Sequence, residues 1–205
     1  MIKPQKGGAV ETSQEARRGE YIMKKTLTWM VCGAVAAMIA ACASSPGVSS
    51  EADLARQAYK DKKITSLIYK KLIDDRLTQS LSITPRCYEG RVYLIGEYDK
   101  EEEKNHAIAI AREVEGVVSL ETYLIPRAGR TEADYQNDVR LSAEVKKNLV
   151  ASGAVSTARL DVVSVQGNIV LVGIVRNEKE IARASEIAQG VEGVQSVICY
   201  LTVFR

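Results

Sequence analysis

VEGV stands at Val114–Val117 and again at Val191–Val194. The neighbouring residues repeat at the same offset of 77, so that Glu89–Arg127 aligns without a gap on Gln166–Phe204. Fifteen of the 39 aligned positions are identical, and they include three pairs of glycines: Gly90 with Gly167, Gly96 with Gly173, and Gly116 with Gly193. Agreement over this length indicates an internal repeat, and it predicts one module of about 65 residues used twice.

The order of elements in one module follows from the periodicity of its apolar residues. The pattern in each copy predicts a helix, two strands, a second helix and a third strand. The first helix is predicted at Lys62–Asp75 in one copy and at Asn137–Ser152 in the other. Apolar residues at helical spacing form the expected core stripes: Ile64, Ile68, Leu72; Ala107, Ile110, Ala111, Val114; Leu141, Val145, Leu149; Ala184, Ile187, Ala188, Val191. Three strands with two helices on one face make each copy a two-layer α+β sandwich.

The paired glycines mark positions where the backbone needs special conformations. Gly90 and Gly167 lie between the first two strands, where a tight hairpin needs a positive φ. Gly116 and Gly193 follow the second helix and are predicted as left-handed helix caps. Gly96 and Gly173 lie inside the second strand, which predicts a bulge or the close approach of a helix.

The N-terminal region reads as a targeting segment. Met23–Cys42 has a basic start, an apolar stretch and small residues before Cys42, which is typical of a secretory signal. Its end, Ile39–Cys42, resembles the bacterial lipobox, so Cys42 is the predicted lipid-attachment residue; the alternative is an ordinary signal with a chance cysteine. Residues Met1–Ile22 do not fit a signal and are interpreted as an extension from an early start, with a cytoplasmic pro-segment as the weaker alternative.

These segments predict the following division of the chain: a start extension at 1–22, a signal peptide at 23–41, a polar tether at 42–60, a first module at 61–127, a linker at 128–136 and a second module at 137–205. Without its first 41 residues the chain carries 22 basic and 23 acidic residues. A balance this close to neutral argues against a nucleic-acid partner.

Catalytic and metal-binding patterns are not found in the sequence. His106 is the one histidine, and it is interpreted as part of a solvated helix face. There is no Ser/His/Asp set, no Cys/His pair and no phosphate-binding glycine loop, so we expect no enzyme activity, cofactor, metal or small-molecule substrate. Cys87 and Cys199 lie in different copies; an export compartment permits a disulfide between them, and the alternative is two free cysteines that behave as small apolar residues.

The motif Gly-x-Val-x-Leu-x-Gly, an Ala-rich helix, and Val-x-Gly-Val-x-x-Val occurs in both copies, at Gly90–Leu120 and Gly167–Val197, with Ile169 and Leu120 each replacing one valine. This pattern resembles the BON domain, and a lipobox before two copies is similar to the outer-membrane lipoproteins with two BON domains. The resemblance implies an αββαβ fold with a mixed sheet in each copy, no catalysis, binding of anionic phospholipid, and support of outer-membrane integrity. It also implies a lipid-anchored, periplasm-facing location at the inner leaflet of the outer membrane, with envelope-assembly proteins as further partners. The alternative is a periplasmic structural, osmotic-stress or protein-interaction module without a specific lipid ligand.

A membrane contact surface is predicted on the helix Asn137–Ser152. At 100° per residue, Val139, Ala143 and Val150 form a stripe away from the core face, and Arg140, Lys146 and Lys147 flank it. An apolar stripe edged by cations suits an anionic membrane surface. The alternative is a helix packed on two sides with solvated basic residues. The first copy carries a similar stripe with Tyr69, Ile73, Lys63 and Lys70. Some of the related lipoproteins have an aromatic residue where this chain has Arg140, which implies weaker and more electrostatic binding here.

Overall fold

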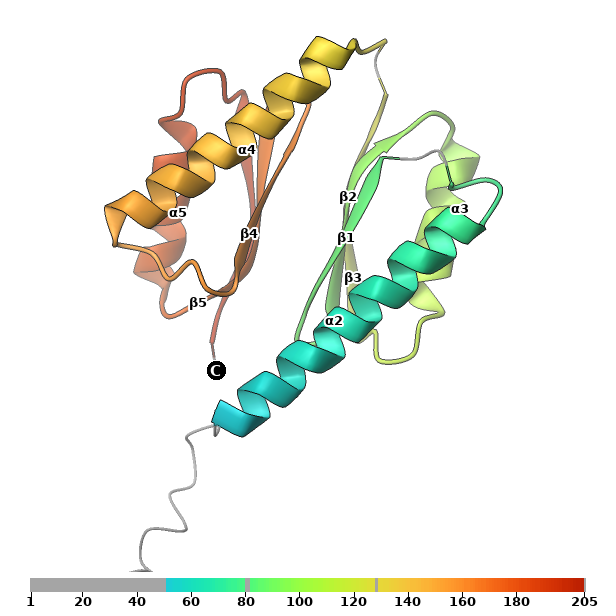
Figure 1. Cartoon of the computed structure of the whole chain (residues 1–205), viewed down its shortest axis with the longest axis horizontal. Coiled ribbons are helices and arrows are strands. Elements are labelled where there is room, and N and C mark those ends of the chain that lie inside the picture. Colours follow the sequence, from blue (N-terminus) through green and yellow to red (C-terminus); the bar gives the residue numbers. More distant parts are fainter. Residues whose placement is uncertain (1–50, 80–81, 128, 205) are drawn as a thin grey trace, which may run out of the picture. The chain divides into compact units, whose positions relative to one another are not determined.

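A computed structural model describes residues 51–79, 82–127 and 129–204 of the chain, and Figure 1 shows the same succession of elements twice. The first copy consists of α2 (Glu51–Asp74), β1 (Ile83–Tyr88), β2 (Arg91–Tyr98), α3 (Glu101–Arg112) and β3 (Ser119–Pro126). The second copy consists of α4 (Glu132–Ser152), β4 (Leu160–Val165), β5 (Asn168–Val175), α5 (Glu178–Gln189) and β6 (Ser196–Val203).

The two sheets have the same topology. In the first copy, β1 and β2 are antiparallel neighbours, whereas β3 lies parallel to β2 on its other side. A parallel neighbour requires a crossover connection, and α3 supplies it. The second sheet repeats this order with β4, β5 and β6. The predicted fold class, two tandem αββαβ units each with a three-stranded mixed sheet, is therefore confirmed.

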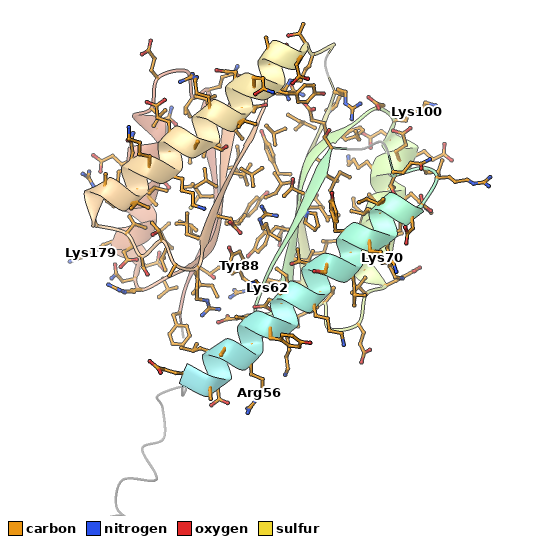
Figure 2. The ribbon with its side chains drawn as sticks, in the orientation of Figure 1. Arg56, Lys62, Lys70, Tyr88, Lys100 and Lys179 are labelled. Carbon is orange, nitrogen blue, oxygen red and sulfur yellow. The ribbon has the colours of Figure 1, made fainter. Side chains whose placement is uncertain are left out.

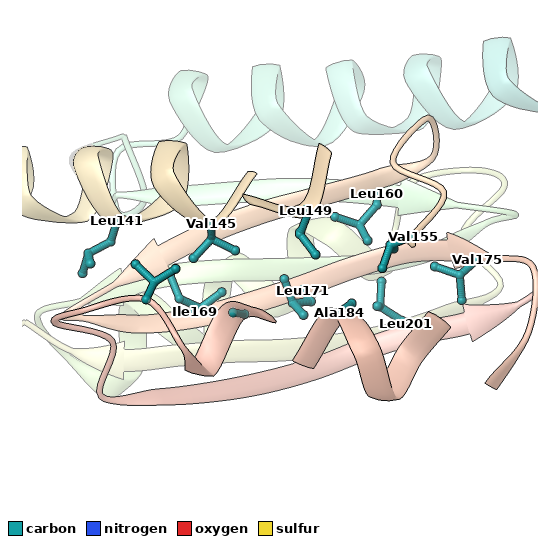
Figure 3. Close-up of a cluster of buried hydrophobic side chains, with 12 residues drawn as sticks. Leu141, Val145, Leu149, Val155, Leu160, Ile169, Leu171, Val175, Ala184 and Leu201 are labelled. Carbon is teal, nitrogen blue, oxygen red and sulfur yellow. The ribbon is translucent and has the colours of Figure 1, made fainter. Parts of the chain in front are cut away.

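Each copy has its own aliphatic core between its two helices and one face of its sheet. In the second copy, Leu141, Val145 and Leu149 of α4 are fully buried against Ile169 and Leu171 of β5, as Figure 3 shows. The helix α5 contributes Ala184 and Ala188, whose small side chains let the helix lie close to the sheet. The equivalent residues of α2, β2 and α3 form the core of the first copy. The predicted core stripes are thus correct in both copies.

The hairpins use the glycines as predicted. Glu89 and Gly90 form the two-residue turn between β1 and β2, with φ values of 53° and 75°. Two central residues with positive φ define the turn type that matches the twist of antiparallel strands. Gln166 and Gly167 repeat this turn in the second copy, with φ values of 53° and 76°.

The prediction that Gly116 and Gly193 cap helices is wrong, because both glycines lie in turns beyond the helix ends. Both have the expected positive φ, of 94° and 93°. However, α3 ends at Arg112, and the N–H of Val117 donates to the carbonyl of Val114 at 3.3 Å, so Gly116 is the third residue of a β-turn beyond the helix. Gly193 occupies the same place in the turn Val191–Val194.

The strand glycines permit a backbone contact rather than the approach of a helix. A Cβ atom on Gly96 would lie 1.9 Å from the carbonyl oxygen of Ser82, and one on Gly173 would lie 2.1 Å from that of Arg159. These carbonyls belong to the residues that lead into the neighbouring strands β1 and β4. The glycines therefore let paired strands close tightly at this end of each hairpin.

Both first helices begin earlier than predicted. The helix α2 starts at Glu51 inside the predicted tether at 42–60, and α4 starts at Glu132 inside the predicted linker at 128–136. Acidic residues occupy the first turn of both helices, which favours the positive end of the helix dipole. In α4 the N-cap Thr131 donates its N–H to Asp134 at 2.7 Å. Polarity alone suggested a loop, and these capping residues explain the helical structure.

The sheet faces opposite the helices are also buried. Tyr93 and Ile95 of β2 form a third apolar cluster with Val165, Val170 and Val172 of the second copy. The rings of Tyr93 and Tyr200 lie 5.5 Å apart between centroids within this cluster. Burial on both faces explains why β5 reads NIVLVGIV with no polar residue in alternate positions.

Candidate membrane interface

Cys42, the predicted lipid-attachment residue, and the predicted signal peptide lie outside the described residues. Among the residues that are described, none of the helices combines the length and the apolar character that crossing a membrane requires. The side chains considered for a membrane contact lie on the outer faces of α4 and α2.

The predicted stripe on α4 is exposed. Val139 and Val150 are 62% and 59% accessible, and Ala143 between them is also exposed. The buried residues of α4, Asp138, Leu141, Val145 and Leu149, lie on the core face of the helix, opposite this stripe. Val139 and Val150 thus form an apolar surface that the described residues leave exposed.

The three predicted cations of α4 differ in their surroundings. Arg140 donates to Glu144 at 3.0 Å and to Asn137 at 3.0 Å, so that its charge is partly neutralised. Lys146 and Lys147 are exposed and have no ion pair or side-chain hydrogen bond with any residue in the described part of the chain. Lys146 and Val139 also border cavities on the side of α4 that faces β4, whereas Lys147 and Val150 border none of the described cavities.

The outer face of α2 is richer in aromatic residues than that of α4. Tyr59 is 72% accessible, Tyr69 53% and Ile73 47%. Lys63 and Lys70 are exposed on the same face, and Figure 2 shows Lys70 beside the ribbon of α2. Helical spacing in the sequence predicts Tyr69 and Ile73 on this face but not Tyr59, because residue 59 falls in the predicted tether at 42–60.

A buried aspartate in each first helix holds the adjacent hairpin. Asp61 is 5% accessible and accepts hydrogen bonds from the N–H groups of Glu89 at 2.9 Å and Gly90 at 3.0 Å. Asp138 accepts the equivalent bonds from Gln166 and Gly167 at 2.9 and 2.8 Å. This pair was not predicted, although the aspartates at 61 and 138 are identical at the repeat offset of 77.

A buried ion cluster surrounds Arg130, which precedes α4. The guanidinium of Arg130 contacts Glu97 at 2.9 Å and also Asp138, and all three side chains are less than 10% accessible. Gln166 donates to the same Glu97 oxygen at 2.7 Å. This cluster joins β2 of the first copy to α4 and to the turn between β4 and β5 of the second, and no sequence motif indicated it.

Both cysteines in the described residues are free, so the permitted disulfide between Cys87 and Cys199 is not formed. Cys87 is buried, as expected for a small apolar residue, whereas Cys199 is exposed. Burial and the neighbouring Asp61 raise the pKa of the Cys87 thiol to about 12. Cys87 is therefore a neutral thiol near neutral pH and not a nucleophile.

His106 is partnered rather than simply solvated. Its Nε2 lies 3.0 Å from the carboxylate of Asp75, so it ties α3 to the residue that follows α2. This hydrogen bond lowers the pKa of Asp75. In the part of the chain that the structure describes, no group of three His, Cys, Asp or Glu residues is arranged to hold a metal. The contact of His106 is structural.

Comparison with known proteins identifies the family. Residues 60–125 and 137–204 each match the BON domain, so the chain belongs to the BON domain family. Among its relatives is the osmotically-inducible protein Y of Escherichia coli (strain K12), which is 29% identical over 67% of this chain and 69% of that protein. The outer membrane lipoprotein DolP of Haemophilus influenzae is 33% identical over 54% of this chain and 57% of its own length.

Among solved structures, the C-terminal domain of CdsD, a structural protein of the type III secretion system of Chlamydia trachomatis, is 17% identical. The match covers 71% of this chain and 67% of that one, with a TM-score of 0.30.

Proposed function

We propose that this chain is a non-enzymatic, lipid-anchored envelope protein whose BON domains bind anionic phospholipid at the inner leaflet of the outer membrane and support its integrity. The observation that carries this proposal is the exposed apolar stripe of α4, Val139 to Val150, beside Lys146 and Lys147, which have no ion pair among the described residues. Each lysine near an anionic surface contributes about 1 kcal/mol of attraction, and the valines contribute apolar contact with the headgroup region.

The relative DolP supports the proposed location, because its name states that it is an outer membrane lipoprotein. We expect the same anchoring here through Cys42. Labelled palmitate should enter the wild-type protein in a bacterial host and should not enter Cys42→Ser. Equal incorporation into both proteins would contradict the anchor but would leave membrane binding by the folded domains open to its own test.

That second test uses the fragment 43–205, since residues 51–205 form one compact unit with its own cores. Sedimentation with anionic vesicles should be strong at low salt and weak at high salt, because exposed charges are screened. The double variant Lys146→Glu with Lys147→Glu should lose most of this binding. The matched control is Lys100→Glu with Lys179→Glu, which makes the same charge change at exposed positions on other elements.

Full binding by the α4 double variant at both salt concentrations would exclude α4 as the contact surface. Lys63→Glu with Lys70→Glu then tests α2, whose exposed Tyr59 and Tyr69 offer the alternative surface. Failure of the wild-type fragment to bind any anionic vesicle would favour the second candidate, a periplasmic stress or structural module. The similarity to the osmotically-inducible protein Y is the observation that supports that candidate.

A further inference from the structure

A cavity of about 570 Å³ lies where α2 and β1 of the first copy meet α4 and the segment before β4 of the second. Four cationic side chains line it: Lys62 from α2, Arg86 from β1, Lys146 from α4 and Arg159 from the segment before β4. The hydroxyl groups of Thr65, Ser66 and Thr157 also line it. Figure 2 labels Lys62 and Tyr88, which both belong to this lining.

The two carboxylates of the cavity are fully engaged with other groups. Asp61 accepts from the hairpin N–H groups of Glu89 and Gly90, from Gln57 and from the Cys87 thiol. Asp161 accepts from the Tyr88 hydroxyl at 2.8 Å and pairs with Arg86 at 2.9 Å. Both carboxylates thus have their hydrogen-bond positions occupied, and neither forms an ion pair with Lys62 or Lys146.

Lys62 and Lys146 keep their charge uncompensated. Within the described residues, neither ammonium group has an ion pair or a hydrogen bond. Four cations face two carboxylates in the lining, which leaves a net charge of +2. Arg159 is partly balanced by Glu89 at 3.6 Å, so that the excess lies mainly on the two lysines. Two like charges on one cavity repel each other, and an anion placed between them would remove this repulsion.

The neighbouring cavity of about 480 Å³ provides a comparison within the same molecule. Its cations, Arg86 and Arg130, are matched by the carboxylates of Glu97 and Asp138, so its lining is neutral. The repeat offset of 77 places Val139 at the position of Lys62 and Tyr69 at the position of Lys146. Val139 and Tyr69 both line this second cavity. The repeat thus puts two lysines in one cavity, and a valine and a tyrosine at the equivalent positions in the other.

We propose that the larger cavity binds a phosphate group, with Lys62 and Lys146 as its charged ligands and the hydroxyls of Thr65, Ser66 and Thr157 as further donors. Charge-assisted hydrogen bonds from ammonium groups to phosphate oxygens are among the strong polar contacts in proteins. The phosphate can belong to a free anion or to a phospholipid headgroup, which share this chemistry. The site does not depend on the proposed membrane function, because a soluble phosphate compound would occupy it without any vesicle.

The test is a pair of NMR titrations of the fragment 43–205, one with inorganic phosphate and one with glycerophosphoglycerol, a headgroup diester without acyl chains. Saturable shifts are expected at the amides of the lining residues 65–66 and 157–158. Lys62→Gln and Lys146→Gln should each weaken binding about tenfold, the loss of one charge-assisted contact. The controls are Lys63→Gln and Lys147→Gln, which change adjacent exposed lysines that line neither cavity.

All four lysines are exposed, so the variants should fold, and an unchanged melting temperature checks this. Binding of either probe that depends on Lys62 and Lys146 supports the site, and the probe that binds identifies a free anion or a headgroup as the source. The proposal is overturned if neither probe gives saturable shifts, or if the control variants lose as much affinity as the cavity variants. Loss of vesicle binding in Lys147→Gln with retained phosphate binding would separate this site from the membrane surface of α4.

Discussion

At the scale of single residues, Gly116 and Gly193 separate a backbone effect from a packing effect. Their φ values are nearly identical, so a valine at either position meets the same backbone strain. Only at Gly116 would the new Cβ crowd a neighbour, lying 3.0 Å from Cδ1 of Ile64, whereas the nearest atoms at Gly193 are 3.5 Å away. We expect Gly193→Val to cost on the order of 1 kcal/mol of unfolding free energy, and Gly116→Val to cost more.

Denaturant unfolding of both variants measures this difference. Gly190→Ala is the control, because Gly190 has a φ of −75° and its nearest atoms lie 3.6 Å from an added Cβ. It should leave the free energy of unfolding the same or slightly raise it. Equal melting temperatures for wild type and both valine variants would contradict the requirement for positive φ.

The repeat explains which residues were predictable from the sequence. Residues that serve each module by itself recur at the offset of 77, and so the core stripes, the hairpin glycines and the turn glycines could be found. Arg130 and Glu97 join the two copies, and their counterparts at the same offset are Asp53 and Ile174. A contact between copies has no reason to repeat, so the alignment could not reveal it.

At the scale of elements, each first helix is attached to its hairpin through a buried aspartate, and in the second copy this attachment depends on pH. Burial alone would raise the pKa of Asp138, but hydrogen bonds from Ser164, from Gly167 and Gln166 N–H groups and from Arg130 outweigh it and lower the pKa. A carboxyl with a lowered folded-state pKa stabilises the fold above its unfolded pKa and loses this contribution as the pH falls through its folded pKa.

Asp138→Asn should therefore lower the free energy of unfolding by on the order of 2 kcal/mol at pH 7, because the amide cannot accept from all four donors. The difference from wild type should shrink as the pH falls below about 4. Urea unfolding at pH 7 and pH 3 measures it, with Asp74→Asn, an exposed carboxylate on α2, as the control for net charge. A difference that is constant with pH would show that the carboxylate charge does not stabilise the hairpin.

Element boundaries were the weakest part of the sequence prediction. The starts of α2 and α4 are polar, and their capping and dipole interactions do not appear in an apolar pattern. Because α2 starts earlier than predicted, its outer face includes Tyr59, and the exposed aromatic surface extends toward the start of the helix. In the candidate membrane site, helical spacing predicted the exposure of the α4 stripe. It did not predict the pairing of Arg140 with Glu144, because exposed side chains can adopt several rotamers.

At the scale of the whole described unit, neighbouring residues of β5 serve two different cores. Leu171 faces α4 and α5, whereas Val172 belongs to the cluster between the two sheets, and both are fully buried. The continuous apolar sequence of β5 was compatible with burial on both faces of the strand. One strand alone does not indicate which elements cover each of these faces. The polar contacts that accompany this cluster, such as the Tyr88 hydroxyl on Asp161, also cross between copies.

We expect Val172→Asp to separate the two copies without unfolding either one. A carboxylate buried without a partner is strongly unfavourable, so the sheets part and water reaches them. Calorimetry should then resolve two transitions, whereas we expect a single one for the wild type, and far-UV circular dichroism should stay close to that of the wild type. Leu171→Asp is the matched control: it places the same charge in the helix-covered core and should abolish the helical signal of the second copy. If Val172→Asp loses as much secondary structure as Leu171→Asp, the two copies do not fold independently and the sheet contact is essential to each of them.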